Sequence, residues 1–274
     1  MEPALVQAMN DTVVEPQTCA FWWLGQHSFT VKLSTSICYI DPFLTPLAGR
    51  LVPPQLHPKE VTNAVIVLGT HDHADHIDRP AWPIIAAASP EAVFVVPLLL
   101  RDRIISELGL SSSRVIGIDD GTSIAIGDVQ VTGVPAAHEF LDVDTNTGLH
   151  PYLGYVLTGG GFSLYHSGDS CIYEGLQAKL RQYELGLAFL PINGRDAKRL
   201  RANCIGNMTY QEAADLAGAI RPGLTVPSHF DMFATNHEDP ELFIDYMRIK
   251  YPDVRTLIPR HYERYVGGVP KDIF

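Results

Sequence analysis

Three histidines and three aspartates lie within nine residues, in the stretch THDHADHID at 70–78. The apolar run VTNAVIVLG at 61–69 precedes this stretch and has the composition of a buried strand. Imidazole nitrogens and carboxylate oxygens are side-chain atoms that bind transition-metal ions in proteins. The spacing forms no amphipathic stripe, so it indicates a metal site directly after a strand.

The order of these residues predicts how they share metal ions. His71 and His73 are two residues apart, so their rings point to the same side of an extended segment and can bind one ion. Asp75 and His76 follow where the chain must turn, and they can bind a second ion beside the first. The pattern HxHxDH therefore predicts half of a two-metal site.

Further candidate ligands follow other apolar runs along the chain. They are His138 after VTGVPAA, Asp169 in YHSGDS and His229 in VPSHF. A single histidine of this kind is more often a hydrogen-bonded core or surface residue than a ligand. The complete set, in this order, favours a metal centre built from the ends of several strands.

The set of motifs resembles that of the metallo-β-lactamase superfamily. That family has a strand-end Asp, the pattern HxHxDH, a lone His, a bridging Asp and a final His, which this chain matches with Asp41, His71-His73-Asp75-His76, His138, Asp169 and His229. The segments WWLGQHSF, IDPFLTP, HSGDS, LPINGRD, GNMTYQEA and VPSHFDMFATNHEDP are similar to the L-ascorbate-6-phosphate lactonase branch. The likeness extends from about Cys19 to Gly268.

This resemblance implies a division of the ligands between two ions. One ion would be held by His71, His73 and His138, the other by Asp75, His76 and His229, with Asp169 as the bridge. Asp41 would hold the ligand loop through hydrogen bonds. We therefore expect two divalent metal ions, with zinc or manganese preferred and iron also compatible with nitrogen and oxygen ligands.

The expected reaction is hydrolysis of a lactone or carboxylic ester. Two divalent ions about 3.5 to 4 Å apart would lower the pKa of a bridging water to about 7 and so supply hydroxide as the nucleophile. A carbonyl oxygen on one ion would place the charge of the tetrahedral intermediate against a cation. The leaving alkoxide needs a proton, and Asp75 is the candidate donor.

A group of basic residues predicts a small anionic substrate. The segment INGRDAKRLR at 192–201 carries four cations just after an expected strand, in a chain that is acidic as a whole. Guanidinium groups bind phosphate by charge-assisted hydrogen bonds, so a phosphorylated sugar acid such as L-ascorbate 6-phosphate fits this cluster. The alternative for such a charge run is a solvated loop or a subunit contact. The candidate substrate contacts are Arg195, Arg199, Asn193 and His261, the last in PRHYERY at 259–265.

Other polar residues near the motifs give weaker signals. His27 in LGQHSF and His166 in YHSGD flank strand ends, where each contacts substrate or ligands or makes a structural hydrogen bond. We place His27 with Asp41 among the residues that hold the ligands. Asp72 and Asp78 are expected to cap loops or to support ligands in the same way. The histidines expected to face solvent are His57, His150 and His237.

The pattern of elements predicts an α/β fold, an αββα four-layer sandwich of the metallo-β-lactamase type. Strands are expected at 21–25, 28–33, 37–40, 92–96, 184–193 and 224–230, with hairpins at 122–136 and 152–169. Helices are expected at 80–88, at 98–110 and after the capping box of Thr209 and Glu212. We expect one domain over 1–274, in which 1–17 is an N-terminal extension.

Composition and charge exclude several classes of partner. The formal net charge of −11 repels the phosphate backbone, so we expect no nucleic-acid partner. No run of about 18 apolar residues offers a membrane span, and the acidic, proline-containing N-terminus has no secretory signal. Four cysteines without a CxxC pair fit the cytoplasm. We expect a homo-oligomer, with the cation cluster or the C-terminal stretch at a subunit contact.

Three other functions stay open on the sequence alone. A nuclease or phosphodiesterase on the same fold is disfavoured by the acidity of the chain. A diiron oxidoreductase is disfavoured because that family carries Glu at the place of His73, and because a flavin module is absent. A non-catalytic metal-binding protein is disfavoured by the completeness of the ligand set.

Overall fold

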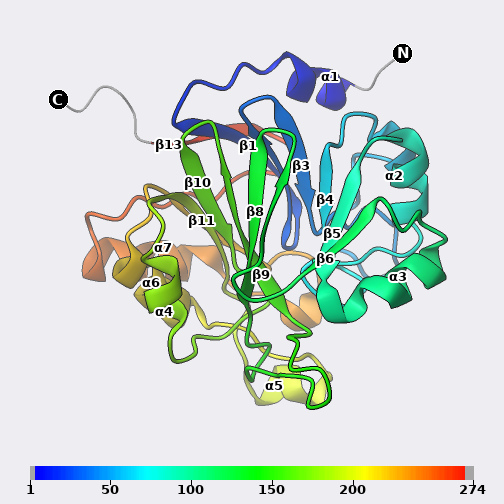
Figure 1. Cartoon of the computed structure of the whole chain (residues 1–274). Coiled ribbons are helices and arrows are strands. Elements are labelled where there is room, and N and C mark those ends of the chain that lie inside the picture. The colour runs from blue at the N-terminus through cyan, green and yellow to red at the C-terminus, as the bar shows by residue number, and fades with distance from the viewer. Residues whose placement is uncertain (1–3, 269–274) are drawn as a thin grey trace.

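The computed structural model describes residues 4–268, which form two mixed β-sheets packed face to face between layers of helices (Figure 1). This is the αββα sandwich predicted from the sequence, and the predicted fold is confirmed. Each sheet has one face against the other sheet and one face under helices. The central strands are therefore buried on both sides, as their continuous apolar runs indicate.

The first sheet has seven strands in the order β13-β1-β2-β3-β4-β5-β6. They are β1 (Thr18–Gly25), β2 (Ser28–Leu33), β3 (Ser36–Ile40), β4 (Ile66–Leu68), β5 (Val93–Pro97), β6 (Val115–Ile118) and β13 (Arg264–Gly268). Strands β3 to β6 pair in parallel, and the rest pair antiparallel. Parallel neighbours need crossover connections, which contain α2 (Trp82–Ala88) and α3 (Arg101–Leu108).

The second sheet has six strands in the order β12-β11-β10-β9-β8-β7. They are β7 (Ser123–Ile126), β8 (Val129–Pro135), β9 (Leu153–Gly159), β10 (Phe162–His166), β11 (Leu185–Pro191) and β12 (Thr225–Ser228). Strands β7 to β10 form an antiparallel meander, whereas β10, β11 and β12 run parallel. Their crossovers contain α4 (Leu176–Leu180), α5 (Ala197–Arg201) and α6 (Tyr210–Ile220).

Helices cover the two outer faces of the sandwich. In Figure 1, α2 and α3 lie beside the first sheet, and α4, α6 and α7 (Pro240–Lys250) lie beside the second. Helix α1 (Ala4–Asp11) buries Val6 and Met9 against the outer face of the first sheet, and Lys32 Nζ donates to the Met9 carbonyl at 3.0 Å. Residues 4–11 of the predicted extension thus belong to the packed fold. The short 3-10 helices are η1 (Pro58–Glu60), η2 (Leu98–Leu100) and η3 (Ala234–Asn236).

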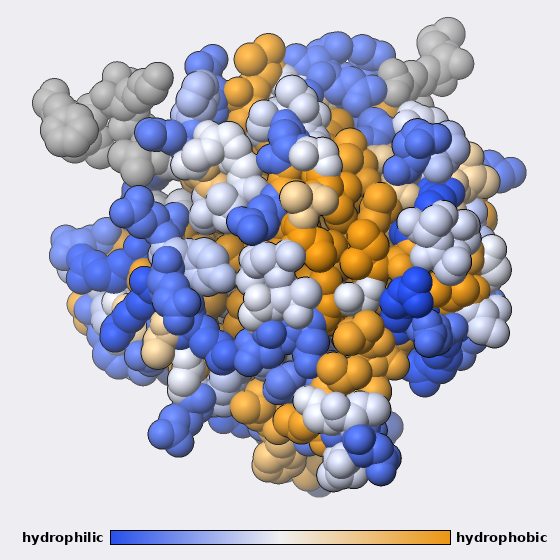
Figure 2. Space-filling model, viewed as in Figure 1, coloured by the Kyte–Doolittle hydropathy of each residue, from blue (hydrophilic) through white to orange (hydrophobic). Residues whose placement is uncertain are grey.

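Aromatic side chains fill the space between the sheets. Phe29 on β2 stacks on Phe189 on β11 with ring centroids 3.8 Å apart, and Phe21 meets the same ring edge-on at 5.4 Å. Such pairs add about 0.5 to 1.5 kcal/mol each to the free energy gained by burial of their area. Figure 2 shows polar side chains over the flanking helices, and apolar side chains along the middle of this face and at its lower end beside α5.

Several local signals in the sequence are confirmed by the structure. The Thr209 hydroxyl accepts from the backbone N–H of Glu212, and the Glu212 carboxylate accepts from the Thr209 N–H, which is the predicted capping box at the start of α6. Gly109 ends α3 in the left-handed region at φ 62°. The predicted helix at 98–110 begins as the 3-10 helix η2, so its α-helical part is shorter. None of the helices in residues 4–268 combines the length and hydropathy that a membrane span needs.

Candidate metal centre

All seven predicted ligands lie at one edge of the sandwich, each shortly after the end of a strand. The HxHxDH segment follows β4, and the other ligands, His138, Asp169 and His229, follow β8, β10 and β12. The first segment comes from one sheet and the other three residues come from the second sheet. The centre therefore lies where the two sheets meet.

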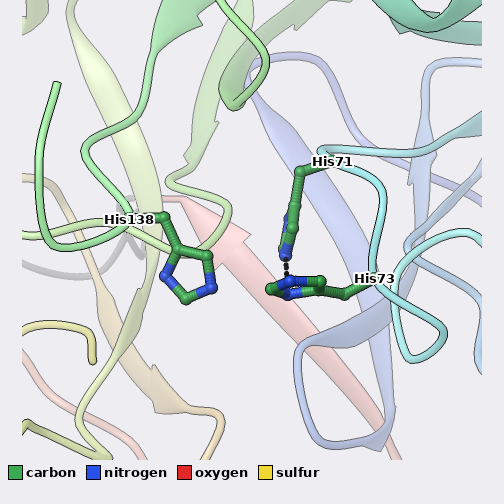
Figure 3. A group of neighbouring side chains, drawn as sticks. All are labelled: His71, His73 and His138. Atoms are coloured by element: carbon green, nitrogen blue, oxygen red, sulfur yellow. Dashed lines mark hydrogen bonds between the residues drawn. The ribbon is translucent and has the colours of Figure 1, made fainter. Parts of the chain in front are cut away.

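One group of ligands consists of His71, His73 and His138, whose ring nitrogens lie within 4.8 Å of one another. Figure 3 shows the three rings facing a common point, two from the loop after β4 and one from the loop after β8. His71 Nε2 and His73 Nδ1 are 2.9 Å apart. His71 and His138 are buried, whereas His73 is half-buried at the mouth of the site.

Two further groups share His76. They are His71, His76 and Asp169, and Asp75, His76 and His229. His76 Nε2 lies 3.4 Å from Asp169 Oδ1 and 3.6 Å from Asp75 Oδ2. Asp169 Oδ2 lies 3.1 Å from His229 Nε2 and 3.7 Å from His138 Nε2, so this carboxylate lies between the two sets of histidines. This position is compatible with the bridging role that the resemblance implies for Asp169, which stays a prediction.

The chemistry of these atoms fits metal ions. Ligand atoms about 2.0 to 2.2 Å from a tetrahedral ion lie about 3.3 Å from each other, and the distances above run from 2.9 to 3.7 Å. Most of them are longer than a good hydrogen bond. His76 Nε2 and Asp169 Oδ1 are moreover buried and have no hydrogen-bond partner. Buried polar atoms normally have partners, so a cation that accepts their lone pairs explains this arrangement.

Known proteins with related sequences support this interpretation. Residues 38–230 match the profile of the β-lactamase superfamily domain, which is more than half of the chain. The chain belongs to the β-lactamase superfamily. UPF0173 metal-dependent hydrolases of Pyrobaculum arsenaticum and Methanopyrus kandleri are both 29% identical to it, over 225 and 226 residues, which cover 81% of this chain and 88% of each relative.

A solved structure shows the same superfamily fold. Igni18, a metallo hydrolase from Ignicoccus hospitalis, superposes with a TM-score of 0.72 at 20% identity and covers 92% of this chain and 100% of that chain. Its fold is thus shared, while its sequence is distant. The profile match, the relatives and the ligand groups together identify the protein as a metal-dependent hydrolase of the superfamily.

The histidines of this superfamily site differ in how they hold protons. Burial lowers the pKa of His71, His73 and His138, so these rings are neutral and present free lone pairs. Burial also lowers the pKa of His76, but the carboxylates of Asp169, Asp75 and Asp41 raise it by more, and it lies well above its ordinary value. In the absence of a cation, His76 therefore binds a proton among the carboxylates.

Asp41 holds the ligand loop, as the resemblance to the superfamily implied. Its carboxylate accepts from the Thr70 N–H at 2.8 Å, from the Thr70 hydroxyl at 2.7 Å and from His76 Nδ1 at 2.6 Å. The bond to Nδ1 leaves His76 Nε2 directed at the metal groups. Asp41 lies in the left-handed region at φ 46°, directly after β3. This conformation turns the carboxylate back toward the loop.

Gln26 is a residue of the site that the sequence interpretation missed. Its side-chain amide donates to Asp75 Oδ2 at 2.9 Å and lies 3.3 Å from His229 Nε2, and its backbone carbonyl accepts from the His229 N–H. It is buried in the turn between β1 and β2. The only signal was its position beside His27 in LGQHSF, and its partners Asp75 and His229 lie 49 and 203 residues away in the sequence.

The predicted substrate contacts Arg195 and Arg199 have carboxylate partners within the chain. Arg195 makes two bonds of 2.6 Å to Glu212. Arg199 is buried and bonds Asp196 at 2.6 Å, the His237 carbonyl at 2.7 Å and the carboxylate of Glu238 at 3.4 Å. Their charges are thus compensated inside the protein, and this pairing was not visible in the spacing of the sequence.

Asn193 and His261 also have structural partners. The Asn193 amide donates to Asn236 Oδ1 at 3.0 Å. His261 Nε2 lies 2.6 Å from Asp231 Oδ2, and its ring stacks on Trp23 with centroids 4.2 Å apart. Neither side chain lies in a metal group of residues 4–268. They support the walls around the centre, and direct contact with substrate stays a prediction for both.

Asp72 and Asp78 support the ligand loop from outside, as expected. Asp72 forms ion pairs with Arg79, at 2.5 Å, and with Arg103 on α3. Asp78 accepts from the backbone N–H groups of Leu44 and Thr45 at 2.8 and 2.7 Å. These contacts tie the loop that carries the histidines to α3 and to the segment after β3.

A cavity of about 390 Å³ opens onto the ligands. Its lining includes the candidate ligands His73, Asp75, His138, Asp169 and His229, and is completed by Ala74, Asn203, Cys204, Ile205 and Asn236. Within residues 4–268, the lining contains no lysine or arginine. A small molecule can therefore reach the candidate ligands, and it meets a lining without lysine or arginine.

Proposed function

We propose that this protein hydrolyses a lactone or carboxylic ester with the help of two divalent metal ions. The observation that carries the proposal is a set of three ligand groups, linked to one another through His71 and His76, several of whose members line an open cavity. Zinc and manganese both suit ligands of this type, and iron is also compatible. When bound, such ions polarise a carbonyl oxygen and lower the pKa of a coordinated water to about 7.

The residues of the chain supply position and proton transfer. His71, His73 and His138 are held neutral by burial and so present nitrogen lone pairs without first losing a proton. Asp75 is partly exposed to the cavity, and Gln26 fixes one of its oxygens. We assign to Asp75 the role of taking a proton from the attacking water and returning it to the leaving alkoxide, a role that its exposure to the cavity supports.

The cavity favours a substrate that is uncharged near the scissile carbonyl. Its lining in residues 4–268 has no cation, and the guanidinium groups of Arg195 and Arg199 already bind carboxylates. Ile205, which lines the cavity, adds an apolar side chain that is 42% exposed. An uncharged lactone or ester fits this lining better than a phosphorylated sugar acid does. L-ascorbate 6-phosphate, the substrate predicted from the sequence, is included in the test for comparison.

The test compares substrates with the zinc-loaded and manganese-loaded protein. We expect turnover of an uncharged lactone or a phenyl ester, loss of that turnover with a chelator and in His71→Ala, and slower turnover of L-ascorbate 6-phosphate. Faster cleavage of bis(p-nitrophenyl) phosphate than of every ester would overturn the proposal in favour of a phosphodiesterase. Bound iron with oxygen consumption and no hydrolysis would favour an oxidoreductase instead. Size-exclusion chromatography with light scattering tests the proposed homo-oligomer.

A further inference from the structure

Two buried histidines lie beside the metal centre but belong to none of its ligand groups. His27, in the turn between β1 and β2, and His166, at the end of β10, are both completely buried. Their rings pack together with centroids 3.9 Å apart. Burial lowers the pKa of both rings, and for His27 the neighbouring His166 lowers it further, so both are neutral.

The hydrogen bonds of these rings fix their tautomers. A carbonyl oxygen only accepts, so His27 Nε2, 3.1 Å from the Gly168 carbonyl, carries the proton and donates it. His27 Nδ1 then accepts from the Ser228 hydroxyl at 2.7 Å. His166 Nε2 donates to the His27 carbonyl at 2.8 Å for the same reason, which leaves its Nδ1 to accept from the Gly168 N–H at 3.2 Å.

The two rings thus bind both backbone polar groups of Gly168. His166 Nδ1 accepts from the Gly168 N–H, and His27 Nε2 donates to the Gly168 carbonyl. Gly168 lies in the left-handed region at φ 58°, and a Cβ there would collide with the carbonyl oxygen of Leu153. The hydrogen bonds orient the peptide groups before and after this glycine, and the next residue is Asp169.

We propose that His27 and His166 are positioning residues that fix the peptides around Gly168, and so hold the Asp169 carboxylate between the two sets of metal-binding histidines. Without this pair the Gly168 N–H loses its side-chain acceptor and the Gly168 carbonyl keeps only the Ser167 hydroxyl, 2.7 Å away. Rotation about the Gly168 backbone bonds can then move Asp169 away from His76 and His229, now 3.4 and 3.1 Å distant. The inference rests on the proposed metal centre and does not depend on which bond the enzyme cleaves. Mutation of residues that orient metal ligands in this way typically lowers metal affinity by about 10- to 100-fold.

Conservative substitutions separate this role from simple packing. A glutamine amide reaches about as far as Nε2 of histidine, and an asparagine amide reaches about as far as Nδ1. His27→Gln therefore keeps a donor for the Gly168 carbonyl, whereas His27→Asn loses it. At position 166 the order reverses, because His166→Asn keeps an acceptor for the Gly168 N–H and His166→Gln does not.

The experiment measures zinc affinity of the four variants by competition with a chromophoric chelator, without any substrate. We expect His27→Asn and His166→Gln to lose about 10- to 100-fold in affinity, and His27→Gln and His166→Asn to stay near the wild type. The exposed His57→Gln serves as a control for loss of an imidazole. Equal losses within each pair, or no loss in any variant, would overturn the proposal.

The thermal transition of each metal-free variant shows whether it folds. If the variants of one histidine do not fold, the two variants of the other histidine are sufficient for the test. A measurement on the unmodified protein is independent of folding defects. Imidazole ¹⁵N chemical shifts should identify both His27 and His166 as neutral Nε2–H tautomers. An Nδ1–H tautomer at either ring would contradict the hydrogen bonds to Gly168. Loss of hydrolysis with normal zinc affinity would count against the proposed reaction and leave this inference standing.

Discussion

The histidines of the centre fall into two sets, one whose pKa is lowered and one whose pKa is raised. Burial is the largest cause of the lowered pKa of His71 and His138, and it outweighs the carboxylate of Asp169, so both rings are neutral. His76 and His229 face carboxylates that raise their pKa values above the ordinary histidine value despite burial. Asp169 responds in the opposite sense: burial raises its pKa, but His229 and His76 lower it well below the ordinary value. Without a metal ion, protons on the second set of ligands therefore balance the carboxylate charges.

The first prediction is that the metal-free fold loses stability as the pH rises above about 7. Below the ordinary histidine pKa of 6.5, the rings of His76 and His229 are protonated in the folded and the unfolded chain, and their ion pairs contribute fully. Above it, the unfolded chain releases these protons first, so folding must take them up again. We expect the Tm of chelator-treated protein to fall from about pH 7 to about 8, below the range where cysteine thiols titrate.

His76→Asn is the matched variant for this pH dependence. It should have a smaller decline in Tm over the same interval, because one of the two proton-binding groups is gone. The histidines whose pKa is lowered act in the opposite sense near pH 6.5, where the unfolded chain still holds part of their protons, and this contribution fades above about pH 7 as the unfolded chain releases them. Identical slopes for His76→Asn and the unmodified protein would show that the proton is not bound at this ring.

The second prediction separates the two roles of Asp75. Asn keeps an oxygen that can face a metal ion, but it cannot take up or release a proton. Asp75→Asn should therefore lower kcat by about 10²- to 10⁴-fold, while metal content falls far less. Metal analysis and ester hydrolysis on the same preparation check this, with the exposed Asp142→Asn as a control. A parallel fall of metal content and kcat would make Asp75 a ligand only.

At the scale of elements, the sequence predicted the candidate ligands and, by resemblance, Asp41 beside them, but it did not predict Gln26 or the partners of Arg199. Each ligand follows an apolar run, and runs of this kind end at the same edge of a sheet, so His71, His138 and Asp169 could be grouped without coordinates. Gln26 could not be grouped with the ligands, because it is a single polar residue that follows no ligand motif and is 49 residues from Asp75. The partners of Arg199 come from the loop at 236–238, across a connection that no periodicity specifies.

The third prediction concerns the segment of α5. Arg199 joins α5 to the loop beside the cavity through Asp196, Glu238 and the His237 carbonyl. Arg199→Met removes the buried guanidinium that donates to the half-buried Glu238, to the exposed Asp196 and to the His237 carbonyl, and should cost about 1 to 3 kcal/mol of stability. Because the loop includes Asn236 of the cavity wall, KM should rise by a similar factor for uncharged and phosphorylated lactones.

The exposed Arg201→Met is the matched control for loss of a cation in the same helix. It should leave the Tm and both KM values near those of the unmodified protein. A rise in KM for phosphorylated lactones alone, in Arg199→Met, would instead restore the phosphate-binding role predicted from the cation cluster. Denaturation curves and steady-state kinetics on the two variants decide between these outcomes.

At the scale of the whole molecule, the metal centre joins the two sheets. Four ligands follow β4 in the first sheet, and three follow β8, β10 and β12 in the second. The layers could be predicted from the alternation of strands and helices, since each sheet needs cover on both faces. The packing of α1 on the first sheet was not predicted, because residues 1–17 carry no strand or strong helix signal in the sequence.

The fourth prediction follows from the position of the metal centre between the two sheets. An ion bound by ligands from both sheets stabilises only the chain in which the sheets are assembled, so metal binding adds to global stability by mass action. With free zinc about 1,000-fold above its Kd, the gain is about 4 kcal/mol, or roughly 8 to 16 °C in Tm for a chain of this size. Asp169→Asn should lose most of this shift, because Asp169 lies between both groups of histidines. The exposed pair His57→Ala and His237→Ala should keep it. Calorimetry with zinc and with chelator measures the shift, and a Tm that does not respond to chelation would mean that the ligands do not hold an ion between the sheets.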